Sequence, residues 1–225
     1  MQMIFQDPSS SINPRRKIGE VLSEPFAIHG VKENVSEFII ELLNQVGLSS
    51  NHANRYPHEM SGGQLQRVGI ARAIALNPSL VVADEPVSAL DVSVQAQVVN
   101  LMIDLKEKLG ISYLFISHDM GVVEYFCDRV AVMYLGKIVE IASSEEIYKQ
   151  PCHPYTEALL NAVPGLELGK IKQKLKVLGD TPDPSTLSHG CSFHTRCPIK
   201  EKQCEEMEPT LKEVTSGHYV ACFLK

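Results

Sequence analysis

Several features are missing from this sequence, and each absence excludes a class of protein. No apolar run is long enough to cross a bilayer, so a membrane-spanning protein is excluded. Residues 1–7 have no basic stretch followed by a long apolar one, so they are not a secretory signal. Positive charge is not in excess: the formal net charge is -6, which argues against nucleic acid as the main partner. We expect a chain that stays in the cytosol and reaches a membrane only through a partner.

A G-x-x-x-x-G-K-[ST] loop, with which many nucleotide triphosphatases hold phosphate groups, is also missing from the 225 residues. Other parts of a phosphate-handling site are nevertheless present. Ser61-Gly62-Gly63-Gln64 predicts a helix with a capping box and little side-chain bulk in its first turn. Exposed N–H groups and the positive end of the helix dipole can then approach an anion. Taken alone, the same four residues also fit a flexible entry into an ordinary helix.

A buried strand delivers two carboxylates to a loop. Residues 80–84 form the continuous apolar run that is typical of a parallel strand covered on both faces, and Asp84 and Glu85 follow at its end. Residues 92–109 predict an amphipathic helix that ends at Gly110. A strand–helix–strand order of this kind predicts a right-handed crossover and a parallel sheet.

Two further polar residues follow predicted strands in the same way. His118 comes after residues 112–117, and Gln6 comes after a short apolar run that ends at Phe5. The carboxyl ends of parallel strands meet at one edge of a sheet, so we expect Gln6, Glu85 and His118 to converge. A carboxylate there can bind Mg²⁺ through water or activate an attacking water. Singly, each residue could equally be an ordinary exposed strand end.

The remaining pattern predicts a second, looser region. Residues 36–46 predict a helix, 9–17 an exposed loop, 130–135 and 137–142 an antiparallel hairpin, and 144–162 a helix broken by prolines. From residue 163 onward the periodicity fades. We expect a small extension there, held together by cysteines rather than by a large apolar core.

Six cysteines are present, and four of them cluster near the end of the chain with the spacing Cys-x5-Cys-x6-Cys-x17-Cys. In a reducing compartment this clustering favours metal or iron–sulfur ligation over disulfides. Zinc ribbons prefer Cys-x2-Cys pairs, whereas four thiolates can also hold a [4Fe–4S] cluster. Iron–sulfur, zinc and unligated thiols all stay open at this point, and His189, His194 and His218 are possible substitutes in a zinc site. The clustered residues are Cys191, Cys197, Cys204 and Cys222.

These motifs, in this order and spacing, resemble those of ABC transporter ATPases. Gln6 matches the Q-loop, Ser61-Gly62-Gly63-Gln64 the signature motif, Asp84-Glu85 the Walker B motif, Asp91 the D-loop and His118 the switch histidine. The stretch His153-Pro154-Tyr155-Thr156-Glu157-Ala158-Leu159-Leu160 and the four clustered cysteines are similar to the oligopeptide, dipeptide and nickel importer branch. The first residues resemble the second of its two paired ATPase subunits, and the resemblance covers essentially the whole chain.

The resemblance implies roles for the matching residues. Glu85 would be the general base and His118 would contact the γ-phosphate of ATP. Gln6 would sense Mg²⁺ and the membrane subunit, and Asp84 would bind Mg²⁺ through water. Ser61, Gly62, Gly63 and Gln64 would cap the ATP held by the other subunit, and Asp91 would couple the two sites across the dimer. For the four clustered cysteines the resemblance implies a [4Fe–4S] cluster.

The resemblance also implies an architecture and partners. The fold class is a partial P-loop α/β fold with a helical subdomain, a parallel core sheet and a cysteine-containing extension, divided at 1–78, 79–143 and 144–225. The partners would be a second ATPase subunit, giving a heterodimer, membrane permease subunits and, indirectly, an external peptide-binding protein. The chain would lie at the cytoplasmic face of the membrane, and the loop after Gln6 would receive the permease.

Two other functions remain open. The chain could be a non-catalytic module that docks on a permease and completes a partner's site, and the tail alone would fit an iron–sulfur redox or regulatory protein. Because the Walker A loop is missing, we expect an N-terminally shortened chain that does not bind ATP tightly by itself.

Overall fold

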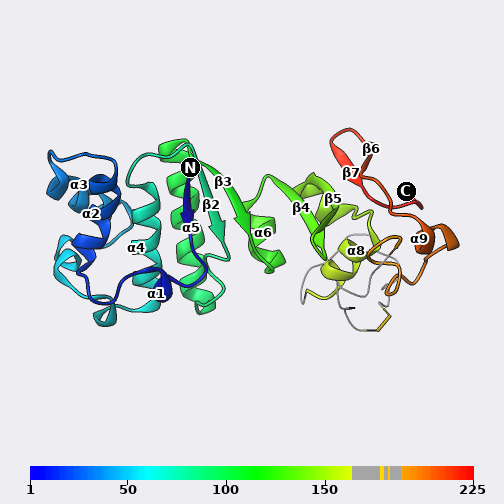
Figure 1. The fold of residues 1–225 in the computed structure, drawn as a ribbon, viewed down its shortest axis with the longest axis horizontal. Coiled ribbons are helices and arrows are strands. Elements are labelled where there is room, and N and C mark those ends of the chain that lie inside the picture. The colour runs from blue at the N-terminus through cyan, green and yellow to red at the C-terminus, as the bar shows by residue number, and fades with distance from the viewer. Residues whose placement is uncertain (164–177, 180–181, 183–188) are drawn as a thin grey trace. The chain divides into compact units, whose positions relative to one another are not determined.

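The computed structural model describes residues 1–163, 178–179, 182 and 189–225, and these form two compact units, Met1–Asp119 and Met120–Lys225. Figure 1 shows the elements along the chain. Parts of the predicted extension, residues 164–177, 180–181 and 183–188, lie outside the described residues.

The first unit contains β1 (Gln2–Ile4), α1 (Pro8–Ser11), α2 (Ile18–Ile28), α3 (Val35–Gln45), the 3-10 turns η1 (Ser50–Asn54) and η2 (Pro57–Glu59), α4 (Gly62–Ile74), β2 (Leu80–Asp84), α5 (Val92–Leu109) and β3 (Ser112–Ile116). The second unit contains α6 (Met120–Phe126), β4 (Arg129–Tyr134), β5 (Lys137–Ser143), α7 (Ser144–Lys149), α8 (Pro154–Asn161), α9 (Lys202–Glu206), β6 (Lys212–Thr215) and β7 (His218–Val220).

The first unit is built on a parallel sheet with the strand order β1-β2-β3. In the register, Ile4 pairs with Ala83, and Asp84 pairs with Ile116. All strands therefore end at the same edge, as the strand–helix–strand pattern predicts. The fold class, an α/β fold with a parallel core sheet and helices beside it, is confirmed.

Helix α4 connects the sheet with the helical part of this unit. It contacts β1 on one side and α1, α2, α3 and α5 on others (Figure 1). Two arginines of α4 fix neighbouring segments: Arg67 donates to the carbonyl of Val46 at 2.7 Å, and Arg72 donates to the carbonyl of Ser11 at 2.8 Å. Hydrogen bonds from guanidinium groups to chain carbonyls satisfy buried acceptors that would otherwise cost free energy.

The segment after Gln6 differs from the exposed loop that the sequence predicts. Asp7 caps a short helix, α1, by accepting the N–H of Ser9 at 2.8 Å. Ile12 then lies in the core with 1% of its surface exposed, so the prediction that this whole segment is exposed is wrong. A single apolar residue among polar ones carries no periodic signal, so only the folded structure reveals that Ile12 is buried.

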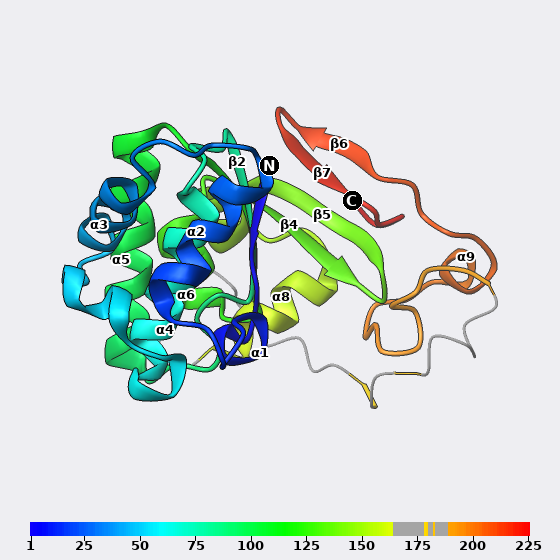
Figure 2. The same cartoon turned by 60° about the vertical axis from the view of Figure 1, so that its left-hand side comes forward.

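The second unit contains an antiparallel sheet with the strand order β4-β5-β7-β6, which Figure 2 shows most openly. The predicted hairpin of β4 and β5 is present, and its turn has positive φ at Leu135 and Gly136. Strand β7 adds to β5, with Glu140 paired to Val220, and β6 adds to β7. These last two strands are short and were not predicted, because each is too short for a clear alternating pattern.

Most predicted elements lie where the sequence places them. The broken helix 144–162 is two helices, α7 and α8, separated by Pro151 and a loop. Helix α2 was missed because Pro25 lies inside it, a residue that usually ends a helical pattern. Among the described residues, no helix combines the length and the apolar character that crossing a bilayer requires.

Candidate functional site

The polar residues at the ends of the three parallel strands form one hydrogen-bonded group. Glu85 is its centre: Gln6 Nε2 donates to one carboxylate oxygen at 2.7 Å, and His118 Nδ1 lies 3.0 Å from the other. The side chain of His118 is 74% exposed and that of Glu85 is 25% exposed. The group is therefore accessible to a ligand at the carboxyl edge of the sheet, as predicted for Gln6, Glu85 and His118.

The backbone of Glu85 has an unusual conformation. Its φ is +42°, in the left-handed region, which costs a non-glycine residue roughly 1–2 kcal/mol. Two hydrogen bonds hold this turn: Glu85 N–H donates to the carbonyl of Ile116 at 2.9 Å, and Ser88 Oγ donates to the carbonyl of Glu85 at 3.1 Å. The turn directs the carboxylate of Glu85 back across the end of β3, where it meets His118.

Two other predicted acidic residues lie nearby in the chain but outside this hydrogen-bonded group. Asp84 is the last residue of β2 and pairs in register with Ile116 of β3. Asp91 is the exposed N-cap of α5, and its carbonyl accepts the N–H of Gln95 at 2.8 Å. Gln95 also donates to Asp119 at 3.0 Å, which links the start of α5 with the segment after His118.

The predicted helix start at Ser61 has the geometry that its sequence implies. Ser61 Oγ accepts the N–H of Gln64 at 3.3 Å, and the side chain of Gln64 accepts the N–H of Ser61 at 3.1 Å. The two glycines differ in their surroundings. A Cβ on Gly63 would lie 2.4 Å from Val94 Cγ1 of α5, whereas a Cβ on Gly62 would meet only Leu90 at 3.7 Å. Gly63 therefore has a packing reason to be glycine, apart from any contact with an anion.

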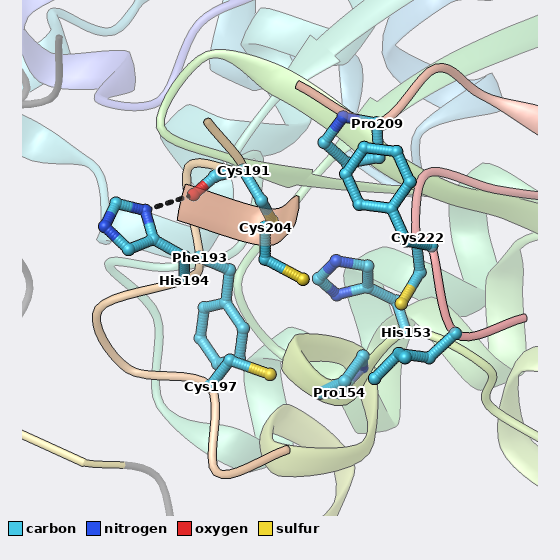
Figure 3. A pocket seen from close by; sticks show the side chains of 11 residues that line it. His153, Pro154, Cys191, Phe193, His194, Cys197, Cys204, Pro209 and Cys222 are labelled. Carbon is cyan, nitrogen blue, oxygen red and sulfur yellow. Dashed lines mark hydrogen bonds between the residues drawn. The ribbon is translucent and has the colours of Figure 1, made fainter. Parts of the chain in front are cut away.

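The four clustered cysteines line one pocket in the second unit (Figure 3), with a cavity volume of about 20 Å³. The sulfurs come from separate segments: the loop before α9, α9 itself and the residues after β7. Gly190 makes the assembly possible, because its φ is +82° and a Cβ there would lie 2.5 Å from the carbonyl oxygen of Cys204. The N–H of Cys191 donates to that same carbonyl at 2.8 Å. The structure thus brings all four predicted cysteines together.

Burial raises the pKa of the thiols of Cys191, Cys197 and Cys222, mainly by desolvation of the thiolate form. A metal would reverse this preference, because coordination deprotonates a thiol. A tetrahedral zinc site with bonds near 2.3 Å needs sulfurs roughly 3.8 Å apart. In the described part of the chain, the group of ligand atoms within 4.8 Å of one another is Glu140, Cys152 and His218, and the four cysteines do not form such a group.

Two buried residues of the second unit, Glu140 and His153, were not predicted as functional. Glu140 on β5 is fully buried, and its oxygens accept the N–H groups of Cys152 at 2.7 Å and His153 at 2.9 Å. His218 Nε2 lies 2.7 Å from the same carboxylate, so His218 is committed to Glu140. His153 is 1% exposed and lines the pocket, and burial lowers the pKa of its imidazole to about 4. The sequence offered one signal for His153: it directly precedes Pro154, and the residue before a proline that begins a helix is expected to be the N-cap.

The other two histidines considered as zinc ligands behave differently. His194 lines the pocket, and its Nδ1 donates to the carbonyl of Cys191 at 2.7 Å, which the dashed line in Figure 3 marks. In the same view its ring points away from the cysteine sulfurs. His189 is exposed in the loop before Gly190. In the described part of the chain, none of the three histidines forms a ligand group with the four clustered cysteines, and His218 instead lies with Glu140 and Cys152.

Two protein-family models match this chain, one in each unit. Residues 1–88 match the ABC transporter family model, and residues 139–204 match the model for the C-terminal region of oligopeptide/dipeptide transporters. The chain is 52% identical to an oligopeptide transport ATP-binding protein of Bacillus subtilis, over 100% of the chain and 69% of that protein. It is 54% identical to a putative peptide import ATP-binding protein of Brucella ovis, over 99% and 71%. It is 48% identical to a dipeptide transport ATP-binding protein of Haemophilus influenzae, over 99% and 69%.

Proposed function

Because the chain belongs to the ATP-binding proteins of the oligopeptide/dipeptide ABC transporter family, we propose that it supplies the hydrolytic groups of an ATPase subunit that powers peptide import. The observation that carries the proposal is the group formed by Gln6, Glu85 and His118 at one sheet edge. Its carboxylate is held between an amide and an imidazole and is still partly exposed. This arrangement suits a base that must accept a proton from an incoming water.

Each residue of this group has a proposed role in ATP hydrolysis. Glu85 orients and deprotonates the attacking water, and His118 contacts the γ-phosphate from the end of β3. Asp84 holds Mg²⁺ through water. Gln6, which follows β1, senses the bound Mg²⁺. Mg²⁺, when bound, offsets the negative charge of the phosphates, which the carboxylates alone would repel.

The start of α4 is proposed to act on nucleotide held by a second ATPase subunit. Ser61, Gly62, Gly63 and Gln64 form the N-terminal end of a capped helix. Asp91, at the start of α5, is proposed to couple the two nucleotide sites across the dimer. The pairing of two different ATPase subunits, the docking on permease subunits at the cytoplasmic face, and a peptide-binding protein as an indirect partner belong to the same proposal. So does the functional division at 1–78, 79–143 and 144–225.

No G-x-x-x-x-G-K-[ST] loop occurs in residues 1–225. We therefore propose that a phosphate-binding loop outside this stretch completes the site, and that the chain alone neither binds ATP tightly nor hydrolyses it. The test compares the 225-residue chain with the same chain joined at Met1 to a segment that carries this loop. We expect tight ATP binding in calorimetry and turnover only in the joined protein. Micromolar binding and Glu85-dependent turnover by the chain alone would refute the proposal.

The four-cysteine pocket is proposed to hold a [4Fe–4S] cluster through Cys191, Cys197, Cys204 and Cys222. The donor set supports it, because four thiols line one pocket. The group would order a region whose ligands come from loops and short elements. Anaerobic reconstitution with iron and sulfide should give a brown protein, and Cys197→Ser should abolish the colour. Colourless protein with one zinc per chain would favour the zinc alternative, and metal-free protein with an ordered pocket would refute ligation.

A further inference from the structure

One ring nitrogen of His153 already accepts a hydrogen bond. Its Nδ1 accepts the N–H of Tyr155 at 3.1 Å, in the first turn of α8. A ring nitrogen that accepts a hydrogen bond carries no proton, so in the neutral imidazole the proton lies on Nε2. The capping contact thereby fixes the tautomer. Nε2–H is then a hydrogen-bond donor on a side chain that is almost completely buried.

The cysteine pocket is the surface that His153 faces. In Figure 3 the imidazole points into the pocket and is drawn between the sulfurs of Cys204 and Cys222. Apart from the cysteines and His194, the side chains that line the pocket are those of prolines, phenylalanines and a leucine, which offer no acceptor. The ring of His194 points away from the sulfurs and donates to a carbonyl. Among the described side chains that line the pocket, the cysteine sulfurs are therefore the hydrogen-bond acceptors that the ring of His153 faces.

The ring of His153 is held firmly in this position. The backbone N–H of His153 donates to the buried carboxylate of Glu140, which also accepts the backbone N–H of Cys152 and lies against the imidazole of His218. Phe193 packs against the ring with centroids 5.7 Å apart. Glu140 lies on β5 and His218 on β7, so the antiparallel sheet fixes the donor relative to the residues after β7, which include Cys222.

We propose that His153 is a positioning residue that donates a hydrogen bond from Nε2–H to a metal-bound sulfur of Cys204 or Cys222. The inference rests on the metal group proposed for the four cysteines. A donor of this kind withdraws negative charge from a ligating sulfur, which favours the more reduced state of an iron–sulfur group and slows loss of the metal. The side chain of His153 would then serve two purposes: Nδ1 caps α8, and Nε2–H donates to a sulfur that binds the metal.

The two nitrogens of His153 can be tested separately with a pair of substitutions. His153→Asn places an amide oxygen near the Nδ1 position, so it keeps the cap of α8 and removes the donor. His153→Gln places an amide N–H near the Nε2 position, so it keeps a donor and loses the cap. Both are made in the full 225-residue chain, reconstituted anaerobically with iron and sulfide. The readouts are iron and sulfide content, midpoint potential, release of iron to a chelator, and thermal unfolding.

We expect His153→Asn to load iron normally, to release it roughly tenfold faster than wild type, and to have a more negative midpoint potential. His153→Gln should release iron at close to the wild-type rate and unfold at a lower temperature. Loaded His153→Asn protein with wild-type release and potential would overturn this inference and leave the proposed cluster intact. Wild-type protein that binds zinc and no iron overturns the cluster, and faster zinc release from His153→Asn than from His153→Gln would then support the donor. Wild-type protein that binds neither metal overturns both.

Discussion

The two units of the chain position their functional groups in opposite ways. In Met1–Asp119 the polar residues stand at the ends of parallel strands, and His118 at this edge is 74% exposed. In Met120–Lys225 the four clustered thiols and the imidazole of His153 come from loops and short elements and converge in a largely enclosed pocket. An open edge suits a ligand that binds and leaves at every cycle, whereas an enclosed pocket of thiols suits a resident group. The substitutions below test whether the two regions are as different as this.

The largest expected effect is on turnover and belongs to the open edge. In the chain joined to a phosphate-binding loop, Glu85→Gln should lower ATP turnover by about 10²- to 10⁴-fold, because the proton acceptor is lost. The amide keeps the size of the side chain, so folding should be unchanged in circular dichroism. The control is a substitution in the second unit, Cys197→Ser, which should remove the metal and leave most of the ATP turnover. Equal losses of turnover in both variants would show that the two regions do not work separately.

The buried carboxylate of the second unit should matter for stability. Glu140→Gln replaces one acceptor oxygen by an NH₂ group that faces N–H donors, and leaving buried donors unpaired costs about 1–3 kcal/mol. The matched control is Glu213→Gln, at an exposed carboxylate that accepts the N–H of Gly217 at 2.8 Å. That change should cost at most about 0.5 kcal/mol. Urea unfolding of the two variants measures the difference, and similar losses would contradict the role given to Glu140.

Gly190 tests whether the cysteine loop needs close backbone packing. In Gly190→Ala the new Cβ would meet carbonyl oxygens of Cys204 and Glu205 at 2.5 and 2.6 Å, and backbone atoms cannot move aside easily. We expect a loss of about 2–3 kcal/mol and poor metal retention. Gly217→Ala is the control, since it also has positive φ but open space around it, and backbone strain alone costs roughly 1–2 kcal/mol there. Equal destabilisation by urea would mean that strain alone explains Gly190.

The smallest effect separates packing from anion binding at the start of α4. Gly63→Ala should destabilise the first unit by about 1–2 kcal/mol, because its Cβ would meet Val94, a stiff β-branched side chain. Gly62→Ala should cost less, since its nearest neighbour lies at an ordinary contact distance of 3.7 Å. Adding Val94→Ala should restore the stability of Gly63→Ala. If the double variant is stable and still impairs turnover in the assembled transporter, Gly63 also acts on nucleotide, and restored turnover would assign it to packing alone.

The accuracy of the sequence-based predictions differs between the two units. Strand β2 and helix α5 begin and end as predicted, because an apolar run with acidic residues after it and a long amphipathic pattern ending at Gly110 are strong local signals. The convergence of Gln6, Glu85 and His118 follows from parallel strand order alone. The burial of Ile12 was missed, because a single apolar residue among polar ones carries no periodic signal.

The sequence by itself determined the parallel-sheet unit, the capped helix at Ser61 and the set of thiols near the end of the chain, since periodicity, caps and residue type are local properties. Only the tertiary structure decided that strand β7 pairs with β5, and that Glu140 therefore lies against His218. It also decided that the capped imidazole of His153 faces the sulfurs of Cys204 and Cys222. These contacts join residues that are tens of positions apart, and no local pattern records them, because their free energy comes from burial and hydrogen bonding after the chain has folded.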